Sequence, residues 1–189
     1  MTEPDGPVVR PAEPGDFTAI QAIYAAEVLH GTASFETRPP SVAEMRARWR
    51  RLAGDGYPWL VCVANEILAG YACAGPYRAR PGYRFTVENS VYVAVTTRGC
   101  GIGRRLLADL IDACDAAGYR QMVAVIGDSA HVASIRLHQS LGFRRAGTLC
   151  EVGYKFDRWL DTVIMQRALG IAAKAFQDRS TALPRFNCS

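Results

Sequence analysis

The chain has 189 residues, 49% of them hydrophobic and 21% charged, which suits one globular domain and excludes a disordered or fibrous protein. Its formal net charge of +4 is too low for the dense cationic face of a nucleic-acid binder. The sequence contains no apolar run of about 18 residues, so no transmembrane helix is predicted. Residues 1–10 lack the apolar stretch of a signal peptide, so we expect a cytoplasmic protein without membrane contact. The cysteines form no CxxC pair, and we expect buried thiols at Cys62, Cys73, Cys100, Cys114, Cys150 and Cys188.

Two helices are predicted near the start of the chain. Apolar residues at three- and four-residue spacing follow Asp16 and continue to His30, as in an amphipathic helix. A second helix begins at Ser41, which has capping-box spacing to Glu44, and ends at the glycines and proline of residues 54–58.

Strands and helices then alternate less regularly. Residues 59–64 and 67–74 are β-rich runs, and the two residues between them, Asn65 and Glu66, predict a tight hairpin. A third strand is expected over about residues 87–95, after a basic and aromatic loop. An apolar-periodic helix begins near Ile102 and stops near Gly118.

The last part of the chain completes the predicted domain. Residues 122–126 are continuously apolar, as in a strand covered on both faces. A helix is expected over residues 134–141, and residues 144–167 suggest a closing antiparallel pair. This order predicts a single mixed α/β domain over residues 8–169, followed by a tail at 170–189.

A glycine-rich turn, RGCGIG at residues 98–103, joins a predicted strand to a predicted helix. Its backbone N–H groups, the helix N-terminus and the side chains of Arg98, Arg104 and Arg105 form an anion site suited to pyrophosphate. The absence of GK[ST] excludes a Walker loop, and the spacing does not match GxGxxG. Asp128 after the next strand leaves a nicotinamide enzyme as an alternative, and a turn without a ligand is another.

The pattern RxxGxG, formed by Arg98, Gly101 and Gly103, resembles the motif with which the GNAT superfamily of N-acetyltransferases holds the pyrophosphate of acetyl-CoA. HVASIRLHQSLGF, residues 131–143, is similar to the later helical motif along which the pantetheine arm lies. Longer stretches within residues 8–169, such as AGYACAGPYRARPGYRFTVENSVYV, resemble the branch that acetylates small amino acids, among them phosphinothricin and methionine sulfoximine or sulfone.

The resemblance implies the GNAT fold, a mixed central sheet flanked by helices, with a splayed pair of strands that binds acetyl-CoA. It also implies a homodimer that uses no metal. Where the family usually has Asn, this chain has His131, whose imidazole could also donate a hydrogen bond. The cofactor-binding residues implied are Val91, Val93, Arg98, Gly99, Cys100, Gly101, Ile102, Gly103, Arg104, His131 and Ser134.

Acetyl transfer needs a neutral amine, a stabilised oxyanion and a protonated leaving thiolate. Strand alternation in TVENSVYV places Glu88 on one face with Ser90 and Tyr92. An apolar setting there would raise the pKa of Glu88 and suit it to act as a base. The resemblance implies this role for Glu88; a surface glutamate on an edge strand is the alternative.

The resemblance places His138 where it could assist the leaving thiolate, and a histidine that packs against Phe143 or Leu137 is the alternative. The expected oxyanion donor is a backbone N–H near Val93.

The acceptor site is expected around the loop before Glu88. Guanidinium groups of Arg78 and Arg80 could clamp a carboxylate or phosphinate, although a solvated basic loop is the alternative. Phe35 resembles the substrate-wall aromatic of the branch or is a core residue, and the remaining substrate-binding predictions are Tyr83 and Tyr92.

The predicted reaction is direct attack of the α-amine of a small amino acid on acetyl-CoA. There are two alternatives, because a shared fold does not determine the substrate. The protein could acetylate peptide N-termini or polyamines, or it could be a non-catalytic acyl-CoA sensor.

Overall fold

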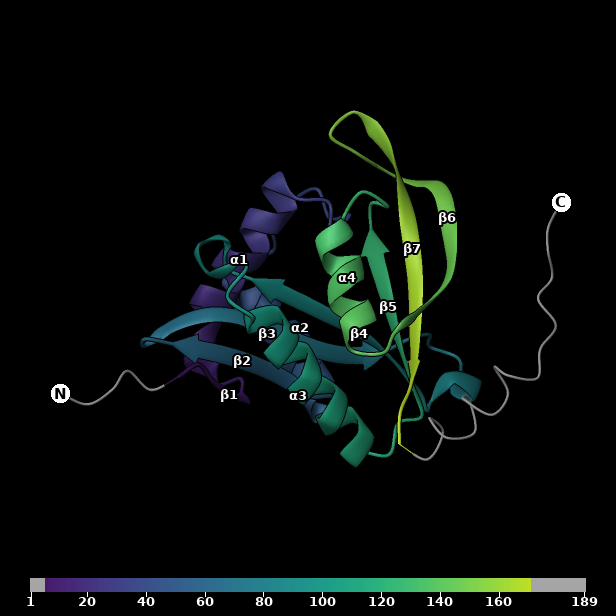
Figure 1. Ribbon diagram of the computed structural model, residues 1–189. Coiled ribbons are helices and arrows are strands. Elements are labelled where there is room, and N and C mark those ends of the chain that lie inside the picture. Colours follow the sequence, from purple (N-terminus) through teal and green to yellow (C-terminus); the bar gives the residue numbers. More distant parts are fainter. Residues whose placement is uncertain (1–5, 171–189) are drawn as a thin grey trace, which may run out of the picture.

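The computed structural model describes residues 6–170 as a seven-stranded mixed sheet with helices on both faces (Figure 1). The strand order is β1-β2-β3-β4-β5-β7-β6, and β4 and β5 are parallel, whereas the other neighbours are antiparallel. The strands are β1 (Val8–Pro11), β2 (Trp59–Ala64), β3 (Ile67–Pro76), β4 (Thr86–Val93), β5 (Gln121–Gly127), β6 (Arg144–Lys155) and β7 (Arg158–Ala168). The helices are α1 (Phe17–His30), α2 (Val42–Gly54), α3 (Ile102–Ala116) and α4 (Val132–Ser140).

The local signals in the sequence predict several of these elements correctly. Ser41 and Glu44 form the capping box at the start of α2, with Glu44 N donating to Ser41 Oγ (3.2 Å) and Ser41 N donating to Glu44 Oε2 (2.6 Å). Asn65 and Glu66 form the hairpin turn between β2 and β3 and have positive φ angles of 50° and 62°. Such angles are characteristic of a two-residue hairpin turn that follows the twist of its strands.

Three features differ from the predictions or lie outside them. The short strand β1 is not predicted, since its four residues include Pro11 and are too few for a periodic pattern. The prediction that all cysteines are buried is wrong for Cys100 and Cys150, which lie in exposed turn and edge-strand positions. Residues 171–189 of the expected tail, including Cys188, lie outside the described residues.

The core consists of two apolar clusters, one on each face of the sheet. On one face α3 buries Leu106, Leu107 and Leu110 against β2, β3 and β4, and α4 packs on the same cluster beside β5. On the other face α1 and α2 bury side chains such as Phe17 and Met45 against β2 and β3. Within residues 6–170, no helix is both long and apolar enough to cross a membrane.

The β4–β5 pair separates partway along its length. Parallel pairing runs from Thr86 opposite Gln121 to Asn89 opposite Ala124. Beyond that point β4 continues beside β3 as far as Val93, and β5 continues beside β7 to the end of the strand. The predicted splayed strand pair is therefore confirmed. We call the space between the diverging ends of β4 and β5 the strand gap.

Candidate active site

The glycine-rich turn forms an open backbone cradle at the N-terminus of α3. Gly99 and Gly101 have φ angles of +81° and +79°, a region that side-chain-bearing residues rarely adopt. Apart from the adjacent residues, no atom lies within 4 Å of a Cβ built on either glycine. The turn leads directly into a helix of fifteen residues, whose N-terminus favours an anion. These features are those of an anion-binding site.

A cavity of about 340 Å³ lies against this cradle. It brings together ten of the eleven predicted cofactor-binding residues: Val91, Val93, Arg98, Gly99, Gly101, Ile102, Gly103, Arg104, His131 and Ser134. The eleventh, Cys100, is exposed and lies outside this lining. The lining also includes residues of α1 and of the segment after it, namely Ile23, Glu27 and Ala33. No short sequence motif marks these three residues as part of a site.

A smaller hollow of about 40 Å³ occupies the strand gap. It shares Ala33, Val91, Tyr92 and Ser134 with the larger cavity, so the two spaces adjoin. Successive residues of a strand direct their backbone groups to alternate sides, and β4 beyond Asn89 has no ladder partner in β5. Every second N–H group of this stretch therefore faces the gap, as the predicted oxyanion donor requires.

His138 is buried in α4 with partners for both ring nitrogens. Its Nε2 lies 3.1 Å from Oδ1 of Asn89, and its Nδ1 lies 2.8 Å from the carbonyl oxygen of Ser134. The ring also packs edge-on against Phe143 at 5.0 Å between centroids. Burial lowers the pKa of His138, and the hydrogen bond to Ser134 partly opposes this. His138 thus combines the predicted packing role with a polar position that lines the strand gap.

Glu88 lies on the face of β4 opposite to His138. It is adjacent to Asn89 in the strand, and neighbouring side chains point to opposite faces of a sheet. Burial raises the pKa of the Glu88 carboxyl, and the positive charge of Arg78 partly offsets this. The prediction of a desolvated glutamate is confirmed. Glu88 is still paired with Val123 and is not among the residues that line the large cavity or the strand gap.

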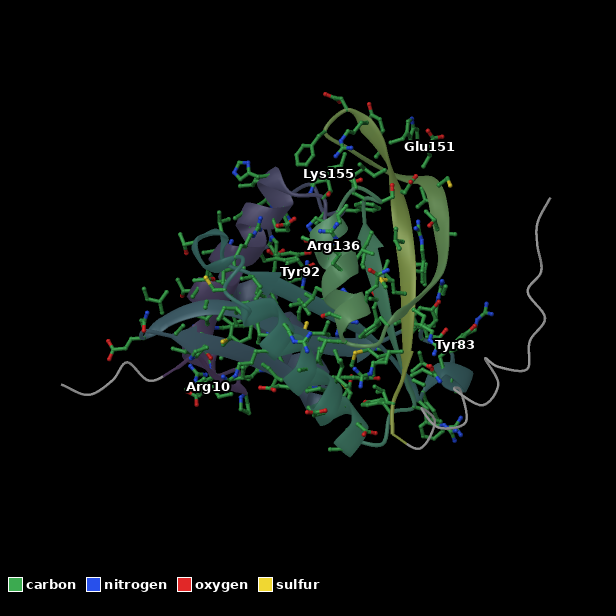
Figure 2. All side chains as sticks on the ribbon, viewed as in Figure 1. Arg10, Tyr83, Tyr92, Arg136, Glu151 and Lys155 are labelled. Carbon is green, nitrogen blue, oxygen red and sulfur yellow. The ribbon has the colours of Figure 1, made fainter. Side chains whose placement is uncertain are left out.

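The residues predicted to bind the acceptor do not form one pocket. Arg78, Arg80 and Tyr83 are exposed in the loop before β4, and Tyr83 packs edge-on against Tyr77. Phe35 lies against Gly127, at the far end of β5, and against Gly153 of β6. Figure 2 shows Tyr83 at one end of the sheet, and Lys155, two residues after Gly153, at the other.

Tyr92 lines both the large cavity and the strand gap. Its ring packs edge-on against Tyr24 at 5.1 Å and stacks with Tyr71 at 5.2 Å between centroids. Burial raises its pKa well above the ordinary value of a tyrosine, so its hydroxyl stays protonated near neutral pH. Tyr92 therefore presents a neutral hydroxyl-bearing ring to the site.

Comparison with known proteins agrees with this geometry. Residues 20–143 match the Acetyltransferase (GNAT) family. A phosphinothricin N-acetyltransferase from Alcaligenes faecalis is 50% identical over 85% of this chain and 82% of its own. An L-methionine sulfoximine/L-methionine sulfone acetyltransferase from Salmonella typhimurium is 43% identical over 85% of this chain and 94% of its own.

A solved structure shows the same fold with a ligand bound. The phosphinothricin acetyltransferase from Sinorhizobium meliloti in complex with acetyl-CoA is 45% identical, with a TM-score of 0.84 over 87% of this chain and 89% of that chain. The glycine cradle, the splayed strands and these similarities agree with one another. The chain belongs to the GNAT family of acetyltransferases, in the branch of the phosphinothricin and methionine sulfoximine N-acetyltransferases.

Proposed function

We propose that the protein transfers the acetyl group of acetyl-CoA to the α-amine of a small amino acid of the phosphinothricin or methionine sulfoximine type. The observation that carries this proposal is the cavity of about 340 Å³ that adjoins both the glycine cradle and the strand gap. Such a cavity suits a long ligand with an anionic end at α3 and a reactive end between β4 and β5.

The residues of the cavity divide into two groups by their chemistry. The backbone of residues 99–103 and the side chains of Arg98 and Arg104 would hold the pyrophosphate. His131 and Ser134 of α4 would bind the arm beside them. The bound acetyl-CoA supplies a thioester, whose carbonyl oxygen would accept from the free N–H groups of β4 near Val93.

Glu88 is the proposed base that takes a proton from the ammonium group of the acceptor, directly or through a water. Its pKa is raised by burial, which brings it closer to the pKa that suits a general base at neutral pH. His138 would support the leaving thiolate from the other face of β4. No step of this reaction requires a metal.

The acceptor site is proposed to combine a cationic and an aromatic part. Arg78 is close enough to Glu88 for its charge to affect that carboxyl, so an acid group held by Arg78 or Arg80 would have its amine near the base. Tyr92, which lines both cavities, and Tyr83, in the same loop as Arg78 and Arg80, would provide the aromatic walls. Phe35 lies at the other end of the sheet and would not contact the same small acceptor.

We propose that the active form is a homodimer. The edge strand β6 and its partner β7 expose four large apolar side chains at fractions of 52% to 61%: Leu149, Val152, Tyr154 and Trp159. A long edge strand with this much apolar surface favours association with another chain. Sedimentation analysis is expected to give twice the monomer mass, and Trp159→Glu should lower it.

A panel of acceptors tests the proposed activity. Purified protein and acetyl-CoA would be incubated with phosphinothricin, methionine sulfoximine, methionine sulfone, a polyamine and a short peptide, and released CoA thiol would be measured. Thiol release is expected with the amino acids at rates well above those with the polyamine or the peptide. A preference for the polyamine or peptide would contradict the acceptor class. Binding of acetyl-CoA without any turnover would indicate an acyl-CoA sensor.

A further inference from the structure

We propose that Glu27 is a positioning residue that couples the acetyl-CoA loop to residues 31–35, which we call the acceptor-side segment. Through this carboxylate, binding of acetyl-CoA would order the segment and strengthen binding of the amino acid. The inference rests on the proposed function, because it concerns the same site.

The Glu27 carboxylate contacts both parts of the site at once. Its Oε2 pairs with Nη2 of Arg98 at 2.9 Å, and its Oε1 accepts a hydrogen bond from the backbone N–H of Ala33 at 3.2 Å. The residue is 8% exposed, so the carboxylate needs both partners to offset its desolvation. One buried group therefore joins a helix, the anion loop and the acceptor-side segment.

The acceptor-side segment depends on side chains for its position. It is neither helix nor strand, and the nearly buried Lys155 donates from its Nζ to the carbonyl oxygens of Gly31 (2.8 Å) and Ser34 (2.7 Å). Ala33, which Glu27 holds, lies between these two carbonyls. The Tyr24 hydroxyl also forms a hydrogen bond with Ser34 Oγ (2.8 Å). Because the segment has no helix or strand bonds of its own, its position depends on such side-chain contacts.

The segment also forms a wall of the proposed reaction site. Ala33 lines both the large cavity and the strand gap. A Cβ built on Gly127, at the end of β5, would lie 2.2 Å from the carbonyl oxygen of Thr32 and 3.0 Å from the ring of Phe35. The segment thus covers the end of β5 closely, and a shift of Ala33 would change the space where the two substrates meet.

Arg98 provides the connection to the cofactor. Its side chain is 53% exposed and belongs to the cradle for pyrophosphate. A guanidinium has five N–H donors, so Arg98 can hold a pyrophosphate oxygen and Glu27 together. An anion at the cradle would restrict the exposed guanidinium, which would in turn restrict Glu27 and Ala33. Coupling of this kind is reciprocal between the two ligands.

Hydrogen exchange measured by mass spectrometry tests the inference without using turnover. In the native protein, saturating acetyl-CoA is expected to slow exchange of a peptide covering residues 31–35 by a factor on the order of five or more. In Glu27→Gln the amide oxygen can still accept from Ala33, but the charged pair with Arg98 is lost. This variant should bind acetyl-CoA, as calorimetry would show, without slowing exchange of the segment.

Two further variants separate coupling from general loosening. Lys155→Met removes contacts to the same segment and a positive charge near Glu27, but it leaves the pair between Glu27 and Arg98 in place. Exchange should therefore rise in the free protein while acetyl-CoA still slows it. Arg98→Gln changes a side chain that is 53% exposed and lies outside the core, so the fold should be retained. At saturating acetyl-CoA this variant should lose the effect on the segment as Glu27→Gln does.

The outcomes distinguish this inference from the proposed function. If acetyl-CoA slows exchange of the segment equally in native protein, Glu27→Gln and Arg98→Gln, the coupling role of Glu27 is overturned. If the native protein fails to bind acetyl-CoA, the proposed function is overturned and the inference with it. Loss of the effect in Glu27→Gln and Arg98→Gln, with its retention in Lys155→Met, would support the coupling.

Discussion

His138 Nε2 lies 3.1 Å from Oδ1 of Asn89, while Asn89 Nδ2 donates to the carbonyl oxygen of Val123 at 3.1 Å. The bond to Val123 sets the orientation of the amide, so the oxygen of Asn89 faces Nε2, while Nδ1 of His138 faces the carbonyl oxygen of Ser134 at 2.8 Å. Both oxygens are acceptors and a neutral imidazole has one N–H, so Asn89 and Ser134 compete for the ring proton. Asn89 was not among the predicted site residues.

Asn89→Leu should preserve approximate volume and remove the acceptor for His138. A buried polar group that loses its partner, here the Val123 carbonyl oxygen, costs about 1 to 3 kcal/mol, so the free energy of unfolding should fall by about that amount. Turnover should also fall, because the Ser134 carbonyl would be the remaining acceptor and would draw the proton of His138 to Nδ1. Chemical denaturation and steady-state kinetics would measure the two effects. Unchanged stability and turnover would show that the hydrogen bond between Asn89 and His138 contributes to neither folding nor catalysis.

His138→Phe tests the histidine itself. Since burial lowers the pKa of His138 in the folded protein, the unfolded state binds the extra proton more readily. The native protein should therefore lose stability as pH falls through the ordinary histidine pKa of about 6.5. The variant should lack this part of the pH dependence and lose about tenfold to a hundredfold in kcat. A preserved kcat in the variant would show that His138 has a packing role and no catalytic role.

The charge of Arg78 should set the pH at which the enzyme becomes active. The base works only when deprotonated, so activity falls as pH drops through the raised pKa of Glu88. Arg78→Gln removes a charge that lowers this pKa, and the acidic limb of the pH–rate profile should therefore move to higher pH. Arg80→Gln is the matched control in the same loop. If the acidic limb of the pH–rate profile lies at the same pH in native protein and in Arg78→Gln, Glu88 is not the titrating base.

Gly103→Val should weaken binding of acetyl-CoA while the fold is retained. A Cβ at this position would lie 3.4 Å from side-chain atoms of Leu137 and Val93, which is ordinary contact, but the branched methyl groups would extend into the cavity. Calorimetry should show a marked loss of affinity, with thermal unfolding little changed. Native affinity in the folded variant would be incompatible with the assigned cradle.

Arg80→Ala should raise KM for the amino acid and leave KM for acetyl-CoA nearly unchanged. Loss of a charge-assisted pair costs on the order of 1.5 to 3 kcal/mol, which corresponds to about a tenfold to hundredfold change in KM. The carboxamide of the same amino acid should be a poor substrate of the native enzyme. Equal turnover of acid and amide would contradict a carboxylate clamp.

Local signals predicted much of the fold, since the capping box at Ser41, the hairpin at Asn65 and the glycine cradle each depend on residues adjacent in sequence. Glu27 could not be predicted in the same way. Its position on the apolar face of α1 was a signal, since a carboxylate is unusual there, but its contact with Arg98 joins residues far apart in the chain and no local pattern specifies it. The separation of Phe35 from Tyr83 likewise depends on the strand pairing of β5, which no local motif specifies.

The most direct test of the central claim is the product formed from methionine sulfoximine and acetyl-CoA. Mass spectrometry and NMR should identify the α-N-acetyl amino acid with native protein. Glu88→Gln should form it at a rate about 10² to 10⁴ times lower, although it binds acetyl-CoA with nearly native affinity. Absence of the N-acetyl product with native protein, or its formation at the native rate by Glu88→Gln across the pH range, would contradict the account.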